Sequence, residues 1–321
     1  MSKFFVGLDI SKISFDVALL FDDNKVKTKK FKNNEKGFSE LQEWLNKHKS
    51  TSLHFCMEAT GVYGESLATY LFDKGYIVSV INPAQIKGFA QSELSRNKTD
   101  RADAQLIARF CRAINPNPWQ PKPIHIRELQ ALVRRAESLQ EMLNQESNRN
   151  EVSSTIVQPS IESVINKLEE EIKKVKNTIK EHINKFTDLR EKCQLLKTIP
   201  GVGEVTISQV LAFIGNIEDF KNAKQVAAFI GLNPKKRQSG TSVQGKTRLS
   251  KIGNSNLRKS FYMPAISAKR YNPIIREFCE HLKASGKPTM LIIGAAMRKL
   301  VHIIFGVLKS RKPFDANYAK I

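Results

Sequence analysis

The sequence predicts a mixed α/β domain at residues 1–125, a helical coiled-coil segment at 126–190 and a mainly α domain at 191–321. Strand-like apolar runs alternate with helical patterns in the first part, and apolar residues at heptad spacing fill the second. Four prolines between residues 114 and 125 indicate a stiff linker. A length of 321 residues is also typical of two or three domains.

Five apolar runs predict the strands of the first domain. They are FFVGLDIS (4–11), FDVALLFD (15–22), VKTKKFK (26–32), LHFCMEA (53–59) and YIVSVINP (76–83). Helical spacing follows the third run, the fourth and the fifth. Three meandering strands followed by βα units favour a mixed sheet of the ribonuclease H or RuvC type, because a doubly wound nucleotide-binding fold more often begins βαβ. Neither GxGxxG nor GxxxxGK[ST] is present.

The charge points to a polyanionic partner. Lys and Arg number 52 against 31 Asp and Glu, and residues 231–312 hold 18 of these basic residues but only two acids. This imbalance favours nucleic acid or an anionic membrane surface. The sequence has no uninterrupted apolar run of about 20 residues, and its N-terminus lacks the pattern of a signal peptide. We therefore expect a cytoplasmic protein that binds nucleic acid and no membrane.

The four cysteines, at positions 56, 111, 193 and 279, lie far apart in the sequence. None belongs to a CxxC motif or a Cys/His cluster. We therefore expect reduced thiols, with neither a zinc site nor a disulfide framework.

Two apolar seams predict two long helices in the middle segment. The first seam consists of Leu129, Leu132, Ala136, Leu139 and Leu143. The second runs from 161 to 186 and includes His182, which we expect to serve packing or register. An antiparallel hairpin or an intermolecular coiled coil would bury these seams. Because one hairpin would be poorly stable alone, we expect oligomerisation.

The segment LLKTIPGVGEVTISQVLAFIG (195–215) resembles a helix-hairpin-helix motif. Gly201 and Gly203 would let backbone N–H groups approach a phosphate at the start of a helix. A tight helix–helix turn without a ligand is the alternative. The remainder up to residue 312 is expected to be helical, with a loop at 233–256 and a buried helix at 290–308.

Four acids stand out from this basic chain. Asp9 lies within the first apolar strand, Glu58 ends a later one, and Asp100 and Asp103 begin a helix that Thr99 can cap. If these elements meet, the four carboxylates repel one another unless a divalent cation, Mg²⁺ or alternatively Mn²⁺, lies between them. Each acid also has a structural alternative, as a turn residue, a helix cap or a first-turn acid.

Three further acids, Asp16, Asp22 and Asp23, are expected at the surface or in turns. Residues 231–259 form a second notable stretch, with eight Lys/Arg and no acid. Ser239 precedes Gly240, which permits close approach of a ligand. Composition alone does not make Ser239 a nucleophile, and a basic loop that grips phosphates is the alternative.

The motifs GLDISK with Asp9, MEATGVYG with Glu58 and NKTDRADA with Asp100 and Asp103 resemble the DEDD signature of one transposase family. This is the insertion-sequence "one-ten" family of RNA-guided bridge recombinases. The runs FIGLNPKKRQSG and SKIGNSNLRK resemble the family's second domain, with its serine at Ser239. The resemblance covers nearly the whole chain.

The resemblance implies that a RuvC-like domain holds Mg²⁺ through the four acids and that Ser239 attacks DNA to form a 5′-phosphoserine link. A bridge RNA encoded by the element would pair with donor and target double-stranded DNA. The family works as a tetramer with active sites assembled between subunits, so we expect a dimer to a tetramer acting at the bacterial nucleoid. The residues expected to neutralise phosphates are Lys235, Lys236, Arg237, Lys246, Arg248, Lys251 and Arg258.

Two rival functions stay open. A metal-dependent nuclease or Holliday-junction resolvase would use the same four acids to activate water, and Ser239 would then be a phosphate ligand. A nucleic-acid-binding scaffold would need none of the acids for its activity.

Overall fold

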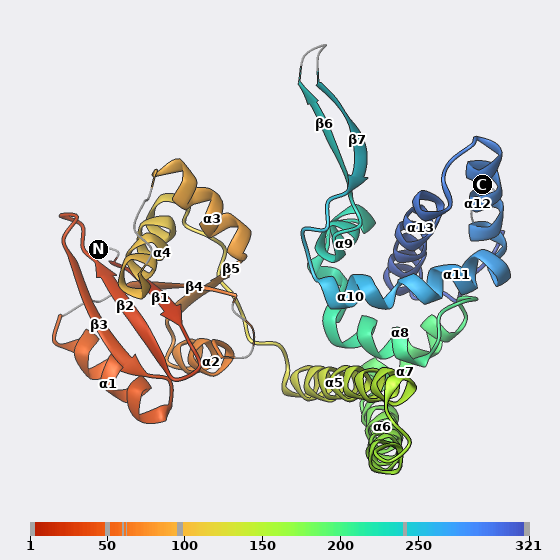
Figure 1. The fold of residues 1–321 in the computed structure, drawn as a ribbon. Helices are drawn as coiled ribbons and strands as arrows, with labels where there is room; N and C mark the ends of the chain where they lie inside the picture. Colours follow the sequence, from red (N-terminus) through yellow and green to blue (C-terminus); the bar gives the residue numbers. More distant parts are fainter. Residues whose placement is uncertain are drawn as a thin grey trace. The chain divides into compact units, whose positions relative to one another are not determined.

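The computed structural model describes residues 4–48, 52–59, 61, 63–94, 99–239 and 243–317, with the backbone alone for 236–239 and 243–247. Contacts divide the chain into unit 1, Met1–Lys122, and unit 2, Pro123–Ile321. Unit 1 is a mixed sheet with helices, and unit 2 is mainly helical (Figure 1). The α/β and mainly α parts that the sequence predicts are thereby confirmed.

The sheet of unit 1 has the strand order β3-β2-β1-β4-β5. Its strands are β1 (Phe4–Ile10), β2 (Ser14–Leu20), β3 (Val26–Lys32), β4 (Leu53–Glu58) and β5 (Ile77–Ile81). The first three pair antiparallel, whereas β4 pairs parallel with both β1 and β5. The meander followed by βα units is therefore confirmed, and its assignment to the ribonuclease H type stays a prediction.

Helices cover both faces of this sheet. They are α1 (Glu35–Asn46), α2 (Glu65–Asp73), α3 (Pro83–Ser92) and α4 (Asp100–Ile114). Because side chains alternate along a strand, Val6 and Leu8 of β1 lie in one core with α1 and α2. Gly7 faces the opposite side, where α4 packs closely on β1 and β2. The two faces thus separate a large apolar core from the helix that carries the two acids.

One cysteine prediction is wrong. Cys56 of β4 and Cys111 of α4 form a disulfide, with their Cα atoms 5.8 Å apart and both residues fully buried. The pair is invisible to sequence spacing because 55 positions separate the two cysteines and only the packing of α4 on the sheet brings them together. Cys193 and Cys279 are free, as expected.

Reduction of this disulfide is expected to destabilise unit 1. A cross-link across 55 residues restricts the unfolded chain, and its loss typically costs about 4 kcal/mol for a loop of that length. Urea unfolding with and without a thiol reductant measures the difference. Cys111→Ala should abolish the effect of the reductant and Cys193→Ala should not. Equal unfolding midpoints for the oxidised and reduced wild type would contradict the prediction.

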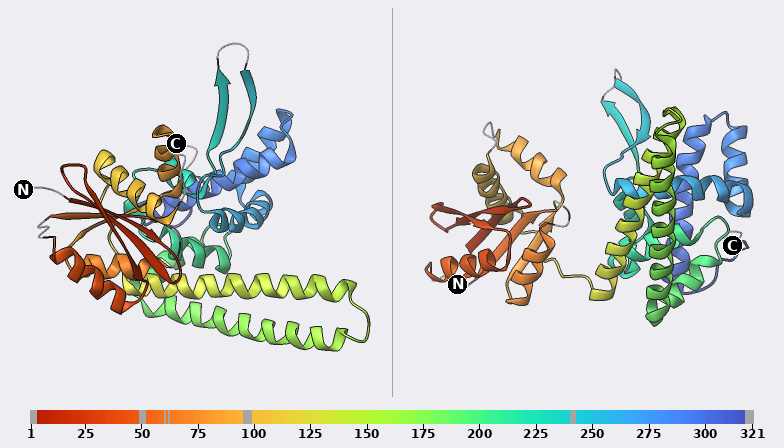
Figure 2. Two further views of the ribbon diagram at one scale, coloured as in Figure 1. Left: turned by 60° about the vertical axis from the view of Figure 1, so that its left-hand side comes forward. Right: turned by 60° about the horizontal axis from the view of Figure 1, so that its bottom comes forward.

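Unit 2 begins with a long helical hairpin that packs with the helices after it. Its helices are α5 (Ile124–Val152), α6 (Gln158–Lys185), α7 (Thr187–Lys197), α8 (Glu204–Gln209), η1 (Val210–Ile214), η2 (Ile217–Asp219), α9 (Ala223–Ile230), α10 (Ser255–Ser260), α11 (Tyr262–Tyr271), α12 (Pro273–Ala284) and α13 (Thr289–Ser310). Figure 2 shows α5 and α6 side by side.

The hairpin buries part of its apolar seams. Leu139 and Ile172 are buried, and Leu129 and Ile183 join one core with the C-terminal helices. Residues 126–190 and 191–321 therefore belong to the same compact unit. His182 has the packing role predicted for it, since its ring lies 5.0 Å from that of Phe186 and its Nε2 is 2.8 Å from the carbonyl oxygen of His125. The coiled-coil geometry and the oligomer stay predictions.

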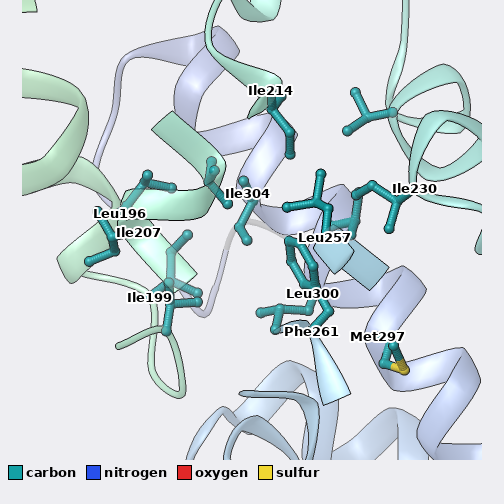
Figure 3. Packing of buried hydrophobic residues seen from close by; sticks show 14 of the residues in the cluster. Leu196, Ile199, Ile207, Ile214, Ile230, Leu257, Phe261, Met297, Leu300 and Ile304 are labelled. Atoms are coloured by element: carbon teal, nitrogen blue, oxygen red, sulfur yellow. The ribbon is translucent and has the colours of Figure 1, made fainter. Parts of the chain in front are cut away.

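The core of unit 2 forms around α13. Leu300 and Ile304 of this helix lie among apolar side chains of α7, α8 and α10 (Figure 3). By length and composition alone α13 could cross a membrane. Its buried residues instead build the core, as predicted for residues 290–308.

The predicted loop at 233–256 contains a two-stranded ribbon, which corrects the sequence interpretation. The ribbon consists of β6 (Pro234–Ser239) and β7 (Val243–Leu249), which pair antiparallel. It projects from the helices of unit 2 in both figures that show the whole chain (Figures 1 and 2). Its many Lys, Arg, Gln and Ser residues lack the apolar alternation that identifies a half-buried strand, so the pairing has no sequence signal.

Candidate active site

The strands β1 and β4 bring Asp9 and Glu58 together. Leu8 pairs with Met57 in the parallel register, so Asp9 and Glu58 are the next residues on two adjacent strands. Both lie on the sheet face toward α4, two residues beyond Gly7 and Cys56 respectively. Asp9 and Glu58 therefore lie next to each other on the sheet face toward α4, at the ends of β1 and β4.

The helix α4 supplies the other two acids. Thr99 caps it as predicted, with its Oγ1 accepting from the amide of Ala102 at 3.2 Å. Asp100 and Asp103 follow in the first turn, where carboxylates are favoured by the helix dipole. Gly7 permits the close packing of this helix, because a Cβ there would overlap the backbone of Ala104 and Ala108.

The electrostatics of Asp9 show that the acids converge. Burial, the largest cause, and nearby negative charges together raise the pKa of Asp9 from 3.8 to about 6. These charges, in order of effect, belong to Asp103, Asp100, Asp16 and Glu58. The structure therefore brings together all four acids predicted from the sequence, and it adds a fifth.

The fifth acid is Asp16, and the structure corrects the prediction that it is a surface or turn residue. It lies directly opposite Asp9 in the antiparallel register, and its side chain is only 17% exposed. Lys30 of β3 contacts it, with Nζ 3.2 Å from Asp16 Oδ2 and 3.4 Å from Asp100 Oδ2. Strand alternation around the turn at residues 11–13 was the signal that could have placed Asp16 beside Asp9. Asp22 and Asp23 are exposed, as predicted.

The donor set could hold a hard divalent cation. All the candidate ligand atoms are carboxylate oxygens, which Mg²⁺ and Mn²⁺ prefer. Lys30 offsets part of the negative charge of Asp16 and Asp100. Burial and the neighbouring carboxylates both raise the pKa of Asp9, and a cation bound among the oxygens would favour its ionised form.

Asp9→Asn is expected to stabilise the protein in a chelating buffer at about pH 8, with the gain vanishing near pH 4. A raised folded-state pKa means that the ionised carboxylate opposes folding, so its cost is complete above about 6 and disappears toward 3.8. The rise corresponds to at most about 3 kcal/mol, which screening of a half-buried group reduces to about 1 kcal/mol. Urea unfolding of both proteins across this pH range measures the gain. A gain that does not change with pH would contradict this origin.

Ser239 lies in unit 2, at the last residue of β6, and pairs with Val243 of β7. Its side chain lies outside the described part of the structure, as do those of Lys236, Arg237 and Lys246.

At the base of the ribbon, Lys235 and Arg248 pair directly across the two strands and both are exposed. Lys251 is also exposed. Like charges opposite each other are unfavourable in a sheet, so this end of the ribbon is suited to bind an anion.

Other predicted nucleic-acid contacts have structural partners. A Cβ at Gly201 would lie 2.6 Å from the backbone of Ala268, so this glycine lets α11 pack against the turn. Gly203 is exposed and directly precedes α8. Arg258 donates from Nη1 to the carbonyl oxygens of Ile230 and Lys251, each at 3.1 Å. Phosphate binding by these residues stays a prediction.

Comparison with known proteins defines the class. A family model described as a transposase, of the DEDD type, matches residues 6–152. A second, described as a transposase of the IS116/IS110/IS902 family, matches residues 193–280. The two matches contain the carboxylates and Ser239 respectively.

Relatives identify the family more closely. The chain is 36% identical over 319 residues to the pilin gene-inverting protein of Moraxella bovis, with 98% of each chain covered, and equally to that of Moraxella lacunata. It is 28% identical over 233 residues to the transposase for insertion sequence element IS1111A of Coxiella burnetii, covering 63% of this chain and 62% of the relative. The chain belongs to the IS110 family of transposases.

Proposed function

We propose that this transposase exchanges DNA strands through a covalent link to Ser239, with its carboxylate cluster as a divalent metal site. The observation that carries the proposal is the convergence of Asp103, Asp100, Asp16 and Glu58 on Asp9. Clustered carboxylates in a basic, DNA-processing chain are best explained as a cation site for phosphate chemistry. The position of Ser239 on a basic ribbon supports its role as the group that meets the DNA backbone.

The covalent step is a transesterification. Oγ of Ser239 attacks a backbone phosphorus, the new O–P bond forms, and the bond to the 3′ oxygen breaks. The serine proton ends on the released 3′-hydroxyl, and the 5′ end stays attached to Ser239. A cation held by Asp9, Glu58, Asp100 and Asp103 would supply positive charge that favours the ionised serine and offsets charge on the phosphate. Attack by the 3′-hydroxyl of another strand reverses the step and completes the exchange through a Holliday-like junction.

An RNA encoded by the element selects the DNA in this proposal. Pairing of a bridge RNA with donor and target sites would set sequence choice, leaving backbone contacts to the protein. The excess of basic residues between 231 and 312 supports such contacts. Lys235 and Arg248, opposed at the base of the ribbon that carries Ser239, are described residues that could bind a backbone phosphate of the same DNA.

An oligomer would complete the active site. The acids lie in unit 1 and Ser239 in unit 2, so the two parts can come from different copies of a dimer or tetramer at the nucleoid. The Moraxella relatives are named for inverting a pilin gene. Inversion requires strands to be cut and rejoined, which agrees with strand exchange in this chain.

A covalent-trap experiment tests the function. The purified protein is mixed with RNA transcribed from its own element, Mg²⁺ and end-labelled donor and target DNA, and is then denatured. We expect label to migrate with the protein, and Ser239→Ala should abolish this adduct because no other Oγ occupies that position. Ser255→Ala, in the first turn of α10, is the matched control and should leave the adduct intact.

The rival functions give different results. Cleaved DNA with 3′- or 5′-phosphate ends and no adduct would indicate a nuclease that activates water, with Ser239 as a phosphate ligand. Full DNA binding without cleavage, unchanged in Asp9→Asn, would indicate a scaffold.

A further inference from the structure

The backbone is unusually constrained where the ribbon joins the helices of unit 2. Gly231 enters the ribbon with φ 81°, and Lys251 and Gly253 leave it with φ 56° and 141°. Lys251 is in the left-handed region, which residues other than glycine seldom adopt. Conformations of this kind persist only where surrounding contacts hold them.

Arg258 of α10 provides such contacts on both arms of the ribbon. Its Nη1 donates to the carbonyl oxygen of Ile230, just before the ribbon, and to that of Lys251, just after it. The guanidinium fills the space at Gly231, where a Cβ would lie 2.5 Å from Nη1. One side chain thus bonds the segment that enters the ribbon and the segment that leaves it.

The backbone of the two arms is also tied directly. The amide of Asn254 donates to the carbonyl oxygen of Phe229 at 2.9 Å, and that of Ser250 to Asn233 at 2.8 Å. A Cβ at Gly253 would overlap the Phe229 oxygen, so only glycine allows the arms to approach this closely.

We infer that Arg258 is a positioning residue that fixes the direction of the ribbon and thereby the location of Ser239. The inference rests on the proposed role of Ser239 and gives Arg258 a task other than the phosphate contact expected from its charge. Ser239 lies eight residues beyond Gly231, about 25 Å along an extended strand. A tilt of about 5° at the joint moves the end of such a strand by about 2 Å, and a misplacement of about 1 Å can slow a reaction about 100-fold.

The test separates DNA binding, chemistry and ribbon order in the full-length protein. Arg258→Ala removes the hydrogen bonds to Ile230 and Lys251. Arg276→Ala removes the same charge from an exposed position on α12 and is the matched control. Gly253→Ala disturbs the joint while keeping the charge of Arg258. For each protein we would measure affinity for a short random-sequence duplex at several salt concentrations, the fraction of protein that binds, the rate of adduct formation at saturating DNA, and amide hydrogen exchange.

We expect Arg258→Ala and Gly253→Ala to speed exchange of the ribbon amides about tenfold, with α9 and α13 unchanged. Adduct formation should slow about 100-fold, whereas duplex affinity stays within about twofold of Arg276→Ala. If the substitution only reduced the amount of folded protein, the fraction of protein that binds DNA and the rate of adduct formation would fall by the same factor. If the Arg258→Ala protein does not fold, the same measurements on Gly253→Ala test the inference.

The opposite pattern would overturn the inference. In that pattern Arg258→Ala weakens duplex binding and lowers the salt dependence by about one phosphate contact, while ribbon exchange stays as in the wild type. If the wild type forms no adduct, the proposed function fails, and hydrogen exchange still decides whether Arg258 orders the ribbon.

Discussion

Asp103→Asn is expected to lower the rate of DNA strand cleavage on the order of 10³-fold while leaving DNA affinity unchanged. The amide keeps the shape of the side chain and its place in the first turn of α4. It removes the charge with the largest effect on the pKa of Asp9 and one of the proposed metal ligands. Single-turnover cleavage at saturating DNA measures the change, and Asp73→Asn, an exposed acid of the same unit, is the matched control.

The same variant separates metal binding from other roles. Mg²⁺ at about 100 times its dissociation constant should stabilise the wild type by about 2.7 kcal/mol, and Asp103→Asn should lose most of this gain. Thermal unfolding with Mg²⁺ or with a chelator measures it. Wild-type cleavage in Asp103→Asn would exclude a catalytic task for this carboxylate. Slow cleavage with undiminished stabilisation by Mg²⁺ would limit the metal ligands to the other acids.

Gly7→Ala is expected to destabilise unit 1 by about 3 kcal/mol or more and to abolish strand cleavage. The new Cβ would overlap backbone atoms of Ala104 and Ala108, which have no rotamer to change. The helix α4 must therefore move away from β1, and Asp100 and Asp103 move with it. Urea unfolding followed by the near-ultraviolet circular dichroism of unit 1 measures the loss.

Gly88→Ala in α3 is the matched control for this substitution. A Cβ at Gly88 meets nothing within 4 Å, so alanine should stabilise the helix by about 0.5–1 kcal/mol. Equal stability of the two variants would show that α4 does not depend on close contact with Gly7.

Local chemistry made much of unit 1 predictable. The apolar alternation of β1 and β2 and the Thr99 cap of α4 are encoded within a few neighbouring residues. Four of the five clustered acids could be found because an acid inside or beside an apolar run is unusual. Asp16 also lies in an apolar run, and its place beside Asp9 depends on the register that the turn at residues 11–13 sets between β1 and β2.

Features that depend on distant packing could not be predicted. The disulfide of Cys56 and Cys111 requires α4 to lie across β4. The sequence predicts Arg258 as a phosphate ligand because it shows only the charge of this residue. The carbonyl oxygens that Arg258 contacts are known only from the folded structure. The ribbon is stabilised by its own pairing and by the joint at its base, neither of which leaves an apolar pattern.

The unequal faces of the sheet in unit 1 set different limits on sequence change. Beneath α1 and α2, large apolar side chains such as Phe15 and Phe55 fill a core that can accept compensating swaps of equal volume. Beneath α4, Gly7 leaves no volume to exchange, since a Cβ there would overlap the backbone of Ala104 and Ala108. Mutagenesis that seeks a more stable enzyme should therefore diversify the first face and keep Gly7 on the second.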